Sequence, residues 1–266
     1  HISGTIDKRD ALLLQTPESL KERYNLDVRV FTEVLSIYTV DKKVSVKNLQ
    51  TGEIYLENYD KLLLSPGAEP IKPPFEGIDS DKIYTLRNIP DMDKIVAKTK
   101  NAQNFVVVGG GFIGLEVAEN LIEAGKSVKL VELGNQVMAP VDFDIASFVH
   151  EKAKQKGLEL LLNVGVEKFN DKGETIEVFL NNGTSLETDA VILAIGVKPE
   201  TKLAIEAGLE IGETRGILVN EFMQTSNPDI YAVGDAIEVA HYINNKKVLI
   251  PLAWPANRQG RIVADN

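Results

Sequence analysis

Cysteine is absent from this sequence of 266 residues. That absence excludes disulfide bonds, zinc–thiolate sites and thiol nucleophiles within the chain. It also fits a cytoplasmic location, where disulfides are rare. Histidine occurs only three times, and His1 and His241 have no partners at the spacing of a metal or catalytic site. No zinc-protease helix motif, phosphate-binding P-loop or serine nucleophile elbow occurs, so we expect no metal.

The sequence also lacks a long uncharged apolar run. The most apolar stretch, Phe105–Ala118, contains four glycines and Glu116, and it is too short and too interrupted to span a bilayer. No basic and then apolar leader opens the chain. Thirty-nine acidic residues against 29 basic ones give a net charge of −10. This excess argues against nonspecific binding to nucleic acid or to an anionic membrane, and favours a solvated acidic surface.

Two stretches are predicted to form short strands joined by turns, because β-branched and aromatic residues alternate with turn residues. The strands expected in the first stretch are Val28–Tyr38, Lys43–Leu49, Glu53–Glu57 and Lys61–Ser65. Those expected in the second are Val164–Asn170, Thr175–Leu180, Ser185–Thr188 and Ala190–Ile195. The pair Asn182-Gly183 marks a hairpin turn in the second stretch.

Between these stretches the pattern alternates strand and helix. The strands expected here are Phe105–Val108, Ser127–Glu132 and Leu158–Leu162. The helices expected are Phe112–Ala124, and a second from Asp142 or Asp144 to Lys156. This order predicts an α/β fold with a parallel sheet and crossover helices. His150 lies on the second helix beside lysines, and we expect it at the surface.

A connector rich in proline, which includes Pro90, precedes the alternating region. The tail of the chain is predicted to contain the strands Gly216–Val219 and Ile230–Val233, a hairpin around Asn244-Asn245 and a helix from Pro255.

The two strand-rich stretches end alike. In each, an aspartate precedes a glycine by seven residues, and the glycine precedes a proline by three: Asp60, Gly67 and Pro70 in the first copy, Asp189, Gly196 and Pro199 in the second. A match of this kind indicates one fold used twice, although two buried strands that both end in glycine are the alternative. The glycine-rich junction of the second copy starts 80 residues before its aspartate. An equivalent junction in the first copy would lie upstream of His1.

The strongest motif is the run from Phe105 to Glu116, in which Gly109, Gly111 and Gly114 fit the pattern G-x-G-x-x-G. A predicted strand precedes it and a predicted helix follows, which is the context of a dinucleotide-binding turn. The first glycine permits the tight turn, the second lets backbone N–H groups approach a pyrophosphate, and the third lets the helix lie close to the sheet. The helix N-terminus then supplies unpaired donors and the positive end of its dipole. A glycine-rich turn that binds nothing is the alternative.

Glu132 ends the next predicted strand, 23 residues after Gly109. A carboxylate at this position can accept hydrogen bonds from both ribose hydroxyls of an adenosine. A 2′-phosphate would meet like charge there, and no lysine or arginine follows in residues 133–136. The sequence therefore predicts a preference for NADH over NADPH, the alternative being a glutamate that faces solvent.

A second motif runs from Thr225 to Asp235 and consists of a turn, a buried strand and an acid at the end of the strand. Ligands of α/β proteins bind at the carboxyl ends of strands. Asp235 could thus hold sugar-like hydroxyls, or it could cap a helix, and the pattern alone leaves both open.

With these motifs the chain resembles the pyridine nucleotide–disulfide oxidoreductases, an FAD- and NAD(P)-binding family, over essentially its whole length. Three segments occur in the order of the family: Leu64–Ala68, Gly109–Glu116 and Thr225–Asp235. Within the family the chain resembles the branch of coenzyme A-disulfide reductases, NADH oxidases and NADH peroxidases, and the stretches Leu12–Glu18 and Pro251–Arg261 resemble most the coenzyme A-disulfide reductases. The resemblance implies two dinucleotide-binding domains of Rossmann type, with the NAD domain inserted in the FAD domain.

The resemblance also implies roles for individual residues. Asp235, with Gly234, would bind the ribityl chain of FAD, and Pro255 and Ala256 would start a helix that points at the flavin. Ser65, Pro66 and Gly67 would lie against FAD. Phe112 would be an aromatic gate over the flavin. Ile113 and Glu116 would line the nicotinamide site, and Gly196 would belong to a loop that closes over NAD.

Two departures from the family accompany this resemblance. The redox cysteine of the branch would precede His1, together with the first glycine-rich FAD unit, and the C-terminal dimerisation domain would follow Asn266. We therefore expect a fragment with residues 1–101 and 199–266 in an incomplete FAD domain and residues 102–198 in an NAD(H) domain. No catalytic residue is expected in this chain.

The parent protein is expected to be a cytoplasmic homodimer that passes hydride from NADH through FAD to a cysteine or disulfide acceptor. The alternatives are an NADH oxidase or peroxidase that reduces oxygen or peroxide, and an NAD-binding fragment or sensor without turnover.

Overall fold

The computed structural model describes residues 2–6 and 8–266, which form two compact units. The first unit comprises the stretch up to Leu13 and Pro70–Gly196, and the second comprises Leu14–Glu69 and Val197–Asn266. The chain therefore passes between the units three times. Residues 70–101 belong to the first compact unit, and the functional boundaries expected at 101/102 and 198/199 stay a prediction.

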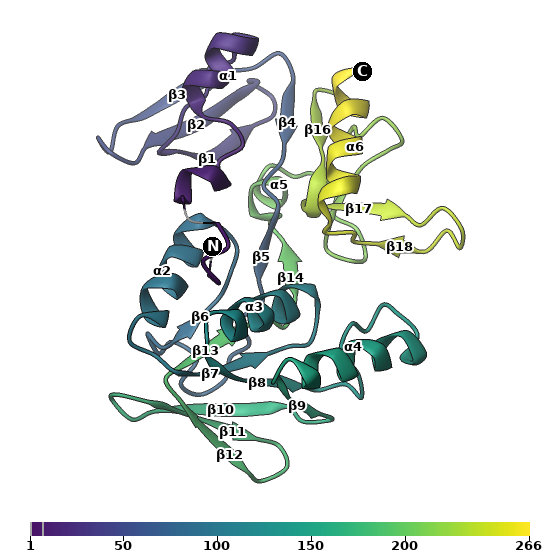
Figure 1. Cartoon of the computed structure of the whole chain (residues 1–266). Coiled ribbons are helices and arrows are strands. Elements are labelled where there is room, and N and C mark those ends of the chain that lie inside the picture. Colours follow the sequence, from purple (N-terminus) through teal and green to yellow (C-terminus); the bar gives the residue numbers. More distant parts are fainter. Residues whose placement is uncertain (1, 7) are drawn as a thin grey trace. The chain divides into compact units, whose positions relative to one another are not determined.

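The first unit is built on a five-stranded parallel sheet in the order β6-β13-β7-β8-β9. Its strands are β6 (Ile83–Tyr84), β7 (Asn104–Val108), β8 (Ser127–Glu132), β9 (Glu159–Leu162) and β13 (Ala190–Leu193). Figure 1 shows the helices of this unit beside the sheet: α2 (Ile89–Thr99), α3 (Phe112–Glu123) and α4 (Phe143–Gln155). An antiparallel meander, β10 (Val166–Asp171), β11 (Ile176–Leu180) and β12 (Ser185–Thr188), and a short 3-10 helix, Arg9–Leu12, complete the unit.

The central strand β7 explains the layering of this unit. Its side chains alternate between two hydrophobic cores: Phe105 and Val107 pack with the helices, and Val106 and Val108 pack with the meander. Successive side chains of a strand point to opposite faces, so a strand that is apolar on both faces must be covered on both. The sheet is accordingly the middle of three layers.

The second unit contains its own core. It includes an antiparallel meander of β1 (Thr32–Tyr38), β2 (Lys43–Asn48) and β3 (Ile54–Asn58), and a parallel pair of β4 (Leu62–Leu64) and β16 (Ile230–Ala232). A further sheet joins β15 (Ile217–Leu218), β17 (Ile237–Ala240) and β18 (Lys247–Val248), and β5 (Ala68–Pro70) pairs with β14 (Val197–Pro199). Its helices are α1 (Pro17–Tyr24), α5 (Lys202–Glu206), the 3-10 turn Gly234–Ala236 and α6 (Ala253–Ala264).

The α/β fold and the strands and helices expected around the glycine-rich motif are confirmed within a few residues. Two expectations were wrong. Pro90 belongs to the first turn of α2 and not to a connector, because proline needs no N–H partner there and the side chain of Asn88 accepts a hydrogen bond from the N–H of Asp91 at 3.0 Å. Helix α6 begins at Ala253 instead of Pro255, which lies in the first turn, where a residue needs no N–H partner within the helix.

The internal repeat is visible in the fold. Both meanders have three antiparallel strands in sequential order, and each has a register shift in its first pair, at Val34/Ser36 and at Val166/Lys168. Each leads into a parallel strand, β4 or β13, and three residues after the end of that strand stands a glycine with left-handed backbone, φ 73° at Gly67 and 112° at Gly196. The two strands that follow, β5 and β14, pair with each other. These shared features favour duplication over chance similarity.

Candidate functional site

In the turn between β7 and α3, two glycines are in close contact with neighbouring backbone atoms. Gly109 adopts φ 106°, and its N–H donates to the carbonyl of Val131 at 2.8 Å. A β-carbon at Gly109 would collide with the carbonyl oxygen of Ala194, and one at Gly114 would collide with that of Gly109. Both positions therefore require glycine for close backbone contact, as the motif predicts.

Gly111 differs from its neighbours because it faces open space. It is the N-cap residue of α3 with ordinary extended backbone, φ −76°, and a β-carbon there would have no atom within 4 Å. No side chain caps the helix at this position, so its first-turn N–H groups have no side-chain acceptor. An exposed helix N-terminus that a ligand can reach to van der Waals distance suits a phosphate.

Glu132 lies at the end of β8 and reaches back to the turn. One carboxylate oxygen accepts a hydrogen bond from the N–H of Gly110 at 2.6 Å, and the other accepts one from the N–H of Gly134 at 2.7 Å. Each oxygen keeps a second lone pair. The carboxylate is thus fixed beside the turn, where it can accept from ribose hydroxyls and where a further anion would be repelled.

A cavity of about 500 Å³ opens over this turn, at the carboxyl ends of β7, β8 and β13. Its lining includes Gly109, Gly111, Glu132, Ala194 and Asn181. Open α/β sheets bind their ligands at this edge. The open N-terminus, the carboxylate and the cavity fit the adenosine diphosphate part of a dinucleotide.

The residues expected around the nicotinamide do not all lie at the cavity over the turn. Phe112 and Ile113 are exposed at 49% and 36% on the first turn of α3. Glu116 lines a different cavity of about 420 Å³, with Ile2 and Met92. Gly196 follows β13, and its carbonyl accepts from the N–H of Ile71 at 3.0 Å. The structure therefore does not bring Glu116 into the cavity over the turn.

The residues expected at FAD gather at the ends of two neighbouring strands in the second unit. Ser65, Pro66 and Gly67 follow β4, and Gly234 and Asp235 follow β16, which pairs with β4 in parallel. Gly67 has no atom within 4 Å of where a β-carbon would stand, so its backbone is open to a ligand.

The first two turns of α6 lie against the same site. The N–H of Gly234 donates to the amide oxygen of Gln259 at 2.8 Å. A β-carbon on Gly234 would lie 3.8 Å from that of Ala256, the neighbour of Pro255. Burial raises the pKa of Asp235. These features fit a group that presents hydroxyls to an acid at a strand end.

The structure overturns the expectation for His150. Its ring is half-buried, and its Nε2 accepts a hydrogen bond from the backbone N–H of Val137 at 3.1 Å, so it is not a free surface residue. Burial, and then the charge of Lys154, lower the pKa of His150. No pattern in the sequence signals this contact, because it depends on the path of the loop between β8 and α4.

Residues 2–6 and 8–266 contain no group of three histidine, cysteine or acidic side chains that could hold a metal ion. His1 lies outside these residues. No helix among them is long and apolar enough to cross a bilayer.

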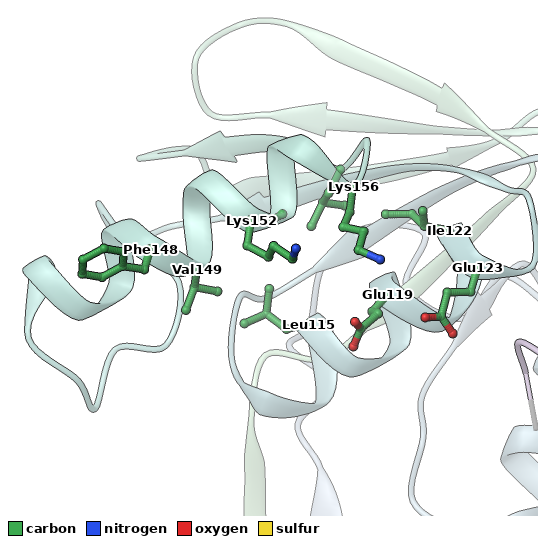
Figure 2. A pocket seen from close by; sticks show the side chains of 10 residues that line it. Leu115, Glu119, Ile122, Glu123, Phe148, Val149, Lys152 and Lys156 are labelled. Carbon is green, nitrogen blue, oxygen red and sulfur yellow. The ribbon is translucent and has the colours of Figure 1, made fainter. Parts of the chain in front are cut away.

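A separate apolar groove of about 320 Å³ lies between α3 and α4. Figure 2 shows Leu115, Ile122 and Val149 along it, with Glu119 on α3 and Lys152 on α4 at its rims. None of the turn glycines lines this groove. It is therefore distinct from the candidate dinucleotide site.

Comparison with known proteins agrees with the geometry. The family described as pyridine nucleotide-disulphide oxidoreductase matches residues 2–260. An NADH oxidase of Methanocaldococcus jannaschii is 37% identical, with 100% of this chain and 59% of that protein covered. A coenzyme A disulfide reductase of Staphylococcus haemolyticus is 32% identical, with 99% and 59% covered. The structure of reduced Bacillus anthracis CoADR-RHD is 49% identical with a TM-score of 0.96, and 99% of this chain and 48% of that chain are covered.

The chain thus spans about three fifths of the length of these curated relatives and about half of the solved chain.

Proposed function

Because the chain belongs to the pyridine nucleotide-disulphide oxidoreductase family, we propose that the turn between β7 and α3 binds the diphosphate of NADH. The observation that carries this proposal is the contrast within the turn. The space beside Gly109 and Gly114 is filled by backbone atoms, whereas the space beside Gly111 is empty and belongs to the cavity. The free N–H groups of α3 then donate to the phosphate oxygens, and the helix dipole favours their charge.

Glu132 sets the choice of nucleotide in this proposal. Its carboxylate accepts from the ribose hydroxyls of the adenosine while Gly110 and Gly134 hold it in place. A 2′-phosphate about 4 Å away would be repelled by up to about 4 kcal/mol at an effective dielectric constant of about 20. Residues 133–136 contain no lysine or arginine that would neutralise this repulsion. NADH is therefore preferred over NADPH.

The second unit is proposed to contribute to an FAD site. When bound, FAD accepts two electrons as hydride from NADH and passes them on. Asp235 would accept from the ribityl hydroxyls, and Ser65, Pro66 and Gly67 would lie against the flavin. Pro255 and Ala256 would direct the N-terminus of α6 toward it. The open backbone at Gly67 and the half-buried acid that follows β16, whose pKa is raised by burial, support this assignment.

Four residues are proposed to act at the nicotinamide. Phe112, exposed on α3, would be the aromatic gate that shields the flavin until NADH enters. Ile113 and Glu116 would line the nicotinamide site, and Gly196 would belong to the loop that closes over NAD. These roles rest on the resemblance to the family and on exposure.

The electron acceptor is proposed for the whole protein and not for this chain alone. A protein that contains this chain and the redox cysteine of its branch would reduce a small disulfide, as a coenzyme A disulfide reductase does, and would act as a cytoplasmic homodimer. An NADH oxidase or peroxidase that reduces oxygen or peroxide is the second candidate, favoured by the relative named NADH oxidase. This chain has no cysteine, so by itself it would bind NADH without reducing a disulfide.

Calorimetric titration of the whole chain tests the nucleotide site. We expect heat from NADH and weaker binding of NADPH. Glu132→Gln keeps an acceptor oxygen for a backbone N–H and removes the charge, so it should narrow the difference between the two nucleotides. Glu132→Ala should also lower the affinity for NADH. No heat with NADH from folded protein would contradict the proposed site, and an unchanged preference in Glu132→Gln would contradict the role of the charge.

Turnover of a protein that contains this chain together with the redox cysteine of its branch separates the candidate acceptors. NADH oxidation is followed at 340 nm with added FAD and with coenzyme A disulfide, hydrogen peroxide or oxygen. Binding of NADH without oxidation by any of the three would favour the non-catalytic alternative. Oxidation that needs only oxygen or peroxide would favour the oxidase or peroxidase.

A further inference from the structure

The loop of residues 133–141, between β8 and α4, lies directly on the glycine-rich turn. The N–H of Met138 donates to the carbonyl of Gly110 at 2.8 Å. Val137 is 1% exposed, and its Cγ1 lies 2.8 Å from where a β-carbon of Gly110 would stand. The N–H of Gly134 is bound by Glu132. The position of Gly110 therefore depends on the path of this loop.

One side chain outside the loop also holds it in place. His150, on the second half of α4, accepts the N–H of Val137 at Nε2, at 3.1 Å. The ring of Phe143 meets the imidazole edge-on with centroids 6.2 Å apart. Because Nε2 accepts, the neutral ring carries its proton on Nδ1. A protonated ring would present an N–H to the N–H of Val137, and the hydrogen bond would be lost.

Few charged groups act on this imidazole. Among the described residues, Lys154 on the same helix is the charged side chain that acts on the ring, and its charge opposes protonation. The loop that faces the ring has no titratable side chain. Burial also opposes protonation, and the pKa of His150 lies below its ordinary value. The neutral ring is therefore the form present at neutral pH.

We propose that His150 is a positioning residue for the dinucleotide turn: its neutral ring holds residues 133–141 against Gly110, and its protonation weakens NADH binding. This inference rests on the proposed NADH site. The direction follows from linkage, since NADH binds better to the form with neutral His150. NADH affinity should fall as pH drops through the pKa of His150, and NADH should in turn lower that pKa.

The test measures both sides of this linkage on the whole chain. Proton–carbon NMR of the imidazole groups follows His150 between pH 8 and 5 without and with saturating NADH. The chain has three histidines, and the spectrum of His150→Gln assigns the signal. We expect NADH to shift the titration of His150 to lower pH. NADH affinity should weaken by about three- to tenfold on the acidic side, which corresponds to one hydrogen bond.

Matched variants separate positioning from packing. His150→Gln places an amide oxygen near the position of Nε2 and does not titrate, so it should bind NADH as the wild type does at pH 8 and keep that affinity at pH 5.5. His150→Ala lacks the acceptor and should bind weakly at both pH values. Lys154→Gln removes the opposing charge, so the loss of affinity should begin at higher pH.

Three outcomes would overturn the inference. The first is that the titration of His150 does not change when NADH binds. The second is that His150→Gln still loses affinity for NADH at acidic pH, and the third is that the wild-type affinity for NADH does not change between pH 8 and 5.5. If the folded wild type fails to bind NADH at pH 8, the proposed site itself is wrong, and the role of His150 falls with it. Circular dichroism and the melting temperature of each variant show that it is folded.

Discussion

Gly111 and Gly114 stand in one turn but face different surroundings, and this difference separates binding from folding. A methyl group on Gly111 meets no protein atom within 4 Å, whereas one on Gly114 meets the backbone of Gly109. We expect Gly111→Ala to keep the wild-type melting temperature. We expect it to lower the affinity for NADH about tenfold or more, equal to about 1.4 kcal/mol, because the methyl group would stand where the phosphate is proposed to bind. Thermal unfolding and NADH calorimetry measure the two effects.

Gly114→Ala is the matched comparison. It should cost about 1–3 kcal/mol of folding free energy, as overpacked positions do, and lower the melting temperature by several degrees. If Gly111→Ala lost stability while keeping NADH affinity, the assignment of Gly111 to the ligand would be wrong.

At this scale the glycines could be predicted from the sequence because their spacing encodes backbone geometry. The spacing of Glu132 also placed it beside the turn. Its hydrogen bonds to Gly110 and Gly134, and the contact of His150 with Val137, could not be predicted. They depend on a loop without periodicity, in which Met138 adopts a left-handed φ of 55° that its residue type does not signal.

At the scale of elements, one ion pair joins the turn before β6 to the first strand of the meander. Asp171 accepts from the hydroxyl of Ser80 at 2.6 Å and from the ammonium of Lys82 at 2.9 Å. The hydrogen bond from Ser80, then that from Lys82 and that from the N–H of Gly173, lower the pKa of Asp171 to about 2. A carboxyl whose pKa is lowered in the folded state stabilises that state above its unfolded pKa of about 3.9.

We therefore expect Asp171→Asn to lower the melting temperature at pH 7, and the difference from wild type to shrink as pH falls from about 4 to about 2. Asp81→Asn is the control, because Asp81 is 88% exposed although its carboxylate lies 3.2 Å from the same lysine. Melting curves between pH 7 and 2 measure both variants. A loss in Asp171→Asn that stayed constant down to pH 2 would show that packing, and not charge, is responsible.

Two elements, β6 and α2, were not predicted from the sequence, each for its own physical reason. Strand β6 has two residues, too few for a period of two to be visible. Helix α2 was hidden by Pro90, although Asn88 with Asp91 three residues later is a start signal for a helix. The long apolar strands and α3 were predictable because burial on two faces, or on one face of a helix, leaves a regular pattern.

At the scale of the molecule, the repeat explains why two proposed ligand-binding edges occur in one chain. Each compact unit has a parallel pair of strands that ends at residues open to a ligand, Gly111 in one unit and Gly67 in the other. Each unit also has a hydrophobic core of its own. Since the proposed NADH residues all lie in the first unit, binding of NADH should stabilise that unit specifically.

Hydrogen exchange of the whole chain, with and without saturating NADH, measures this localisation. We expect NADH to protect peptides of the first unit, above all those that contain residues 109–116 and 132–141, because the ligand binds the turn and the loop that rests on it. Peptides that contain Gly67 and Asp235 should exchange as they do without ligand. FAD should give the complementary pattern, weakly, because the first FAD motif of the family is not part of this sequence. Protection by NADH centred on residues 65–67 or 234–236 would reverse the assignment of the two edges.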